Sequence, residues 1–105
     1  MRLLAPFTVY NGAVYKLHLF ETTNGIVSHK PVEEETAYTL YVQGIAIIAD
    51  NALDTPLLNE IIRQKQANGA DLQEISKAIA KEVATEGSAI YVANFPFVAI
   101  QRIEE

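Results

Sequence analysis

Residues 2–32 read RLLAPFTVYNGAVYKLHLFETTNGIVSHKPV, and this stretch decides the fold. Two Asn-Gly pairs, Asn11-Gly12 and Asn24-Gly25, separate three runs that are rich in apolar, β-branched and aromatic residues. Asn-Gly is the strongest short-range signal for a two-residue hairpin, because a type I′ turn needs a positive φ at both central positions. The stretch therefore predicts a three-stranded antiparallel meander, with strands over residues 2–10, 13–22 and 26–32.

Beyond the meander, the apolar pattern predicts one more strand and then two helices. Residues 36–49 are rich in Tyr, Val, Ile and Thr, which favours a fourth strand that bends at Gly44. The first helix is expected to begin at Asp54-Thr55-Pro56 and to end at Asn68-Gly69. The second is expected to begin at Asp71 and to end at Gly87. The helical residues predicted to pack against the sheet are Leu57, Leu58, Ile61, Ile62, Leu72, Ile75, Ile79 and Val83.

Residues 89–103 return to strand character, and Pro96 predicts a bulge or an end of the pairing within them. We expect this strand to pair inside the sheet, because a long apolar strand at an edge invites aggregation. The predicted fold is a single α+β domain over residues 1–105. It is an antiparallel sheet of about five strands in the order ββββααβ, with a helical hairpin packed on one face.

The two turns also fix which residues face each other. A two-residue loop at Asn11-Gly12 places Val9 opposite Val14 and Leu3 opposite Phe20, and the second loop places Phe20 opposite His29. His18 and His29 then form a diagonal pair on one face, about 7–8 Å apart at the backbone, and Lys16 is expected to continue the row. Lys16, His18 and His29 are therefore the candidate binding residues. The alternative is two unrelated histidines that bond to solvent or to carboxylates.

A metal site at the two histidines would need more ligands. Two imidazoles are fewer than a zinc site uses, so Glu33, Glu34 or Glu35 would have to complete it. The chain has no cysteine, which excludes disulfides, cysteine–zinc sites and thiol catalysis. We therefore expect no metal and no cofactor.

Both faces of the predicted hairpin are apolar, and two narrow helical stripes can cover only one of them. A second copy of the chain would cover the other face, so we expect a two-fold homodimer. The expected contact residues are Phe7, Val9, Val14 and Phe20. The alternative is a strongly curled sheet that buries both apolar faces within one chain.

Composition narrows the function without specifying it. The net charge of −5 over 105 residues argues against a nucleic-acid partner, and no apolar run reaches the ~20 residues of a membrane span. No signal peptide is apparent, so a cytoplasmic location is expected. Because no catalytic motif is found, we expect a non-catalytic interaction or assembly module that self-associates through its sheet. The alternative is a small α+β enzyme that uses His18, His29 and Lys16 in a cleft or at a protomer interface.

Overall fold

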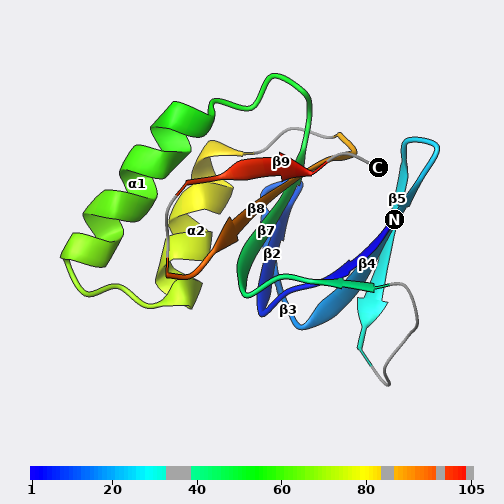
Figure 1. Ribbon diagram of the computed structural model, residues 1–105, viewed down its shortest axis with the longest axis horizontal. Coiled ribbons are helices and arrows are strands. Elements are labelled where there is room, and N and C mark those ends of the chain that lie inside the picture. Colours follow the sequence, from blue (N-terminus) through cyan, green and yellow to red (C-terminus); the bar gives the residue numbers. More distant parts are fainter. Residues whose placement is uncertain (33–38, 84–86, 97–98, 104–105) are drawn as a thin grey trace.

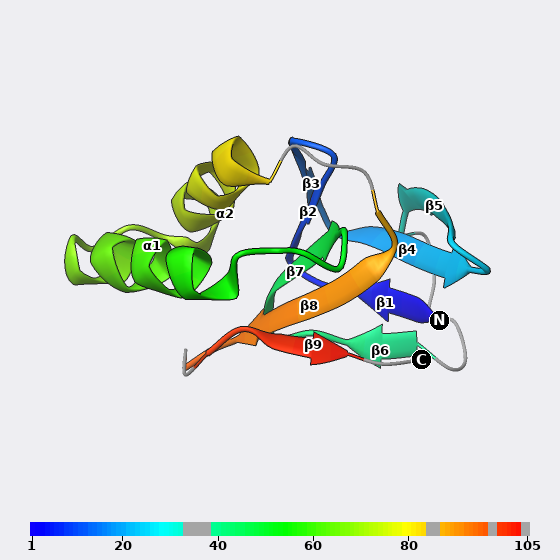
Figure 2. The ribbon, with the colours of Figure 1, turned by 90° about the horizontal axis from the view of Figure 1, so that it is seen from above.

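The computed structural model describes residues 1–32, 39–83, 87–96 and 99–103 (Figure 1). Both helices lie on one side of the strands, and the N-terminus lies on the other side (Figure 2). The described elements follow along the chain as β1 (Arg2–Leu4), β2 (Phe7–Tyr10), β3 (Ala13–Lys16), β4 (His18–Thr23), β5 (Ile26–Pro31), β6 (Thr39–Tyr41), β7 (Gly44–Ala49), α1 (Thr55–Ala67), α2 (Leu72–Glu82), β8 (Ala89–Asn94) and β9 (Gln101–Ile103).

Three of the long runs read as strands are each bent into two. β1 leads into β2 past Ala5-Pro6, β3 into β4 past Leu17, and β6 into β7 past Val42-Gln43. Main-chain hydrogen bonds bridge the bends, since Leu17 N donates to Pro6 O at 3.1 Å and Val42 N donates to Leu4 O at 2.9 Å. The bends divide the strands into sheet A, with the order β5-β4-β1-β6, and sheet B, with the order β3-β2-β7-β8-β9.

Both hairpin registers are confirmed. Leu3 faces Phe20, Val9 faces Val14, and Phe20 faces His29. The first turn has φ of 50° at Asn11 and 80° at Gly12, and the second turn repeats this geometry with 52° and 78°. These are the positive φ values for which Asn-Gly is suited, so the local turn chemistry determines the register of the whole meander.

The prediction of a purely antiparallel sheet in the order ββββααβ is wrong, although the α+β class is confirmed. β6 pairs with β1, and β7 pairs with β2, in parallel. The fourth strand thus lies beside the first and not beside β5, and a parallel pair of this kind requires a crossover connection. All six residues of β7 are buried. A continuous apolar run is typical of a strand that is covered on both faces.

The last predicted strand is two strands. β8 pairs with β7 on one side and with β9 on the other, so its place inside the sheet is confirmed, whereas β9 forms the edge. The cis peptide bond Phe95-Pro96 follows directly after β8. Pro96 therefore stands at an end of the pairing, as predicted, but the chain then turns back along β8.

The helices form where the capping residues predict them. The side chain of Asp54 accepts a hydrogen bond from Leu57 N at 3.1 Å, and that of Asp71 accepts one from Glu74 N at 2.9 Å. α2 ends at Glu82, five residues before the predicted stop at Gly87. Neither helix in the described part of the chain is both long and apolar enough to cross a membrane.

The first core lies between the helices and sheet B. Leu58 and Ile62 of α1 meet Ile75 and Ile79 of α2 over the buried face of the sheet. Leu57 was predicted to join this face, but its side chain is 44 % exposed. The row of Leu58 and Ile62, four residues apart, faces the core, and Leu57 lies one position to its side.

A second core lies between the two sheets. Its buried members come from both sheets and include Leu3, Phe20, Ala46, Ile48 and Ile90. The bends fold sheet A back over sheet B, so a single chain covers both of its apolar faces. This is the curled-sheet alternative.

The curled sheet changes the status of the four expected contact residues. Val9 is fully buried in the first core and Phe20 is fully buried in the second, while Phe7 and Val14 are half-buried. The four residues thus do not form one exposed face, because the bend at Leu17 separates them. The dimer itself stays a prediction, but an exposed face formed by these four residues is no longer an argument for it.

Candidate binding site

Five rings gather on the inner face of the curled sheet, and we call them the ring cluster: Tyr10, Tyr15, His18, Phe20 and His29. Phe20 is buried at its base, and His29 is exposed at the edge formed by β5. The ring of His29 stacks on Phe20 with centroids 4.8 Å apart and meets Tyr15 at 4.5 Å. The tyrosines come from sheet B and the other three rings from sheet A, so the bend at Leu17 assembles the cluster.

Within the ring cluster, the two histidines lie on one face of adjacent strands, as the hairpin register predicted, and their rings meet. Nδ1 of His18 lies 3.2 Å from Nδ1 of His29, and the ring centroids are 5.3 Å apart. Two neutral imidazoles fit this distance by sharing one proton in a hydrogen bond, since each neutral ring has one nitrogen that donates and one that accepts. Two imidazolium rings would place two positive charges at that contact.

The surroundings favour the neutral form of His29. Loss of water around its ring lowers the pKa of His29, and the neighbouring His18 lowers it further. Phe20 and Tyr15 lie against the ring and displace part of this water. One ring nitrogen of this histidine is therefore available as an acceptor near neutral pH.

Lys16 does not continue the histidine row. It lies in β3 two residues after Val14, whose side chain packs on the helix side of sheet B, and the two therefore share a face. Leu17 then adopts a φ of +54°, which interrupts the alternation before His18. Without that bend, Lys16 and His18 would lie on the same face, as the sequence predicted.

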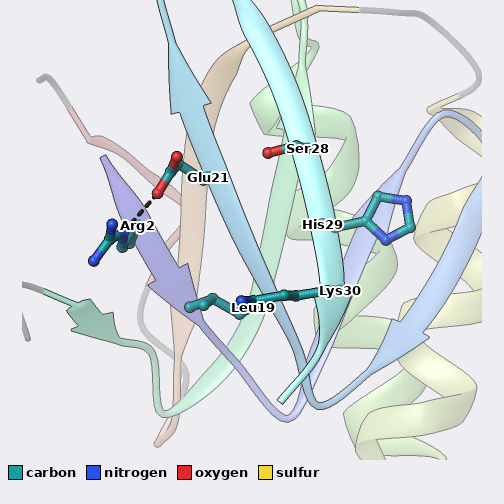
Figure 3. A pocket seen from close by; sticks show the side chains of 6 residues that line it. All are labelled: Arg2, Leu19, Glu21, Ser28, His29 and Lys30. Atoms are coloured by element: carbon teal, nitrogen blue, oxygen red, sulfur yellow. Dashed lines mark hydrogen bonds and ion pairs between the residues drawn. The ribbon is translucent and has the colours of Figure 1, made fainter. Parts of the chain in front are cut away.

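A groove of about 380 Å³ lies on the opposite, outer face of sheet A, and sequence reasoning did not find it. Its lining residues are Arg2, Leu19, Glu21, Ser28, His29 and Lys30 (Figure 3). The ring of His29 points to the other side of β5 from the rest (Figure 3). The sequence did contain a signal for this groove, because the register of the two hairpins places Arg2 opposite Glu21 and Glu21 opposite Ser28.

The polar centre of this groove is an ion pair. Arg2 Nε donates to Glu21 Oε2 at 2.5 Å, and this bond with the guanidinium charge lowers the pKa of Glu21. Both side chains are more than 40 % exposed, so the pair is screened by solvent. The Glu21 carboxylate in this groove is therefore already paired.

Glu33, Glu34 and Glu35, which the sequence suggested as further ligands for the histidines, lie outside the described residues. Within the described ranges, no group of three or more His, Asp or Glu side chains is placed to hold a metal ion. The structure thus brings together two of the three candidate binding residues, His18 and His29, and separates Lys16 from them. Comparisons with known proteins found no family model, no curated protein and no solved structure that matches this chain.

Proposed function

We propose that the protein is a non-catalytic interaction module that joins its sheet A to that of a second copy through β5. One observation carries this proposal: β5 is a six-residue strand at the end of sheet A. The other edge strands among the described residues, β3, β6 and β9, have only three or four residues. A free strand edge presents a row of unpaired N–H and C=O groups to which another strand can bind.

The side chains of β5 favour an intermolecular contact. Five of its six residues are exposed, and Ile26 is 71 % exposed, which makes it the most exposed large apolar residue in the described chain. Exposed apolar side chains beside an open edge gain free energy when a partner strand covers them. The self-association expected from the sequence is retained, but it moves from the buried hairpin face to this edge.

A two-fold axis restricts the register of such a contact. In an antiparallel pair of two β5 strands, the inner faces of the two sheets lie on the same side only if one residue of β5 lies opposite its own copy at the axis. If that residue is Ser28, Pro31 lies outside the ladder. This choice is favourable because proline has no N–H to donate. Ile26 then lies opposite Lys30 of the second copy, so the two Lys30 charges do not oppose each other.

The enzyme alternative receives no such support. It needs Lys16 in one cleft with the two histidines, and these side chains lie on different faces of the bent sheet. The outer groove has its carboxylate already paired with Arg2. The interaction module is therefore the function that the geometry favours.

The test is the mass of the chain in solution. Sedimentation equilibrium at micromolar concentration should give a dimer for the wild type and a monomer for Ser28→Lys, which sets two lysines against each other at the two-fold axis. Within its own chain the new lysine faces Glu21, so the fold should persist, as circular dichroism would verify. The control Ser28→Thr should remain dimeric. A wild-type monomer at every concentration, or a dimeric Ser28→Lys variant, would overturn the proposal.

A further inference from the structure

We propose that His18 and His29 bind one divalent first-row transition-metal ion, such as Zn²⁺, through their two Nδ1 atoms. The ion would replace the proton that the two rings share, and it would lie to one side of the line between the two nitrogens. This inference concerns the ring cluster alone, and it does not depend on whether β5 pairs with a second copy.

The distance between the two nitrogens fits a metal ion. Zinc binds histidine nitrogen at about 2.0–2.1 Å, so two ligands at a tetrahedral angle lie about 3.3 Å from each other. The two Nδ1 atoms are 3.2 Å apart. An ion can therefore bridge them with little movement of β4 or β5.

The rings are also held in place before any ion arrives. His18 and His29 come from adjacent strands whose register is fixed by the Asn24-Gly25 turn. His29 is stacked on Phe20, and His18 lies against Tyr15 with centroids 5.2 Å apart. Rings that are already oriented lose little conformational freedom on binding, and this lowers the cost of chelation.

A histidine must be neutral to act as a ligand, so the test is made above pH 7. His29 is exposed, which gives an ion access from solvent.

The sequence argued against a metal because two imidazoles are too few for a closed zinc site. The site proposed here is of a different kind, in which the two imidazoles would hold the ion and water would take the remaining positions. Imidazole pairs suit zinc, copper and nickel, whereas magnesium and calcium prefer oxygen ligands. The site should therefore discriminate strongly between Zn²⁺ and Mg²⁺.

Isothermal titration calorimetry of the whole chain with ZnCl₂ at pH 7.5 tests the site. We expect one Zn²⁺ per chain, no heat from MgCl₂, and binding that is about tenfold or more weaker in His18→Gln and in His29→Gln, because each change removes one arm of the chelate. Lys16→Gln is the matched control, since Lys16 lies nearby in sequence on the other face and should not affect affinity. A zinc affinity that either histidine change leaves unaltered, or no zinc binding by the wild type, would overturn the proposal.

A second measurement needs no substitution and so is independent of any effect on folding. Zinc bound through Nδ1 leaves the proton on Nε2 of both rings. The ¹⁵N chemical shifts of the two imidazoles, recorded with and without ZnCl₂, should show this tautomer for both residues in the bound state. Shifts that do not change with zinc, or that place the ion on Nε2, would contradict the assignment.

Discussion

Gly44 packs directly against Ala93, the neighbour of its ladder partner Asn94 in β8. A methyl group on Gly44 would overlap the Ala93 carbonyl oxygen and lie 2.8 Å from the Phe95 ring. Neither the ladder carbonyl nor the half-buried ring can withdraw easily. Gly44→Ala should therefore destabilise the fold by about 1–3 kcal/mol or more, as overpacking does in a close-packed interior. Urea unfolding followed by circular dichroism measures the change.

Gly69 provides the control for Gly44→Ala. It has a φ of +78°, but open space surrounds the position of a Cβ. Gly69→Ala should then cost only the backbone strain of a left-handed alanine, about 1–2 kcal/mol, without a steric clash. If Gly44→Ala is the milder of the two changes, the close contact with Ala93 is not what requires glycine there.

The two faces of the helices differ in what they contribute to stability. Ile79 is fully buried in the first core, and Ile79→Ala should lower the free energy of unfolding by about 2–5 kcal/mol. Leu57 is exposed at the start of α1, and Leu57→Ala should change that free energy by no more than about 0.5 kcal/mol. Thermal and urea unfolding of the two variants check this contrast, and equal effects would mean that α1 packs with another face.

What the sequence predicted correctly depends on local chemistry. The Asn11-Gly12 and Asn24-Gly25 turns are determined by φ preferences of adjacent residues, so both registers, and the placing of His18 and His29 on one face of adjacent strands, followed from them. The helix starts at Asp54 and Asp71 were predicted for the same reason.

What the sequence did not predict depends on positions without a local signal. Leu17 adopts a positive φ that is unusual for its residue type, and the bend there places Lys16 and His18 on different faces. The parallel pairing of β1 with β6 joins segments that are distant in the chain, and nothing near either segment announces it. The bend and the crossover together produce the second core, so a purely local reading left one apolar face uncovered and assigned it to a second copy.

Thr8 carries a buried hydroxyl that finds no partner among the described residues. A buried polar group without a hydrogen bond costs about 1–3 kcal/mol. Thr8→Val keeps the branched shape and removes the hydroxyl, so we expect it to raise the free energy of unfolding by about 1 kcal/mol or more. Thr8→Ser, which keeps the hydroxyl and loses a methyl group, should have the opposite sign. A destabilised Thr8→Val variant would show that the hydroxyl is satisfied in solution.

His29 should make stability depend on pH below neutrality. Its pKa is lowered in the folded chain by loss of water and by His18, so the unfolded chain binds a proton more readily. The stability that His29 contributes to the folded chain is therefore complete above the ordinary histidine pKa of about 6.5. It is lost as the pH falls from that value toward the lowered pKa of His29 in the folded chain. With EDTA present to exclude metal ions, urea unfolding from pH 7.5 to 5 should show a decline for the wild type that His29→Gln flattens. Glu21→Gln is the matched control, because the lowered pKa of Glu21 acts on stability only below the ordinary glutamate range. If His29→Gln declines as steeply as the wild type, another group is responsible for the acid sensitivity.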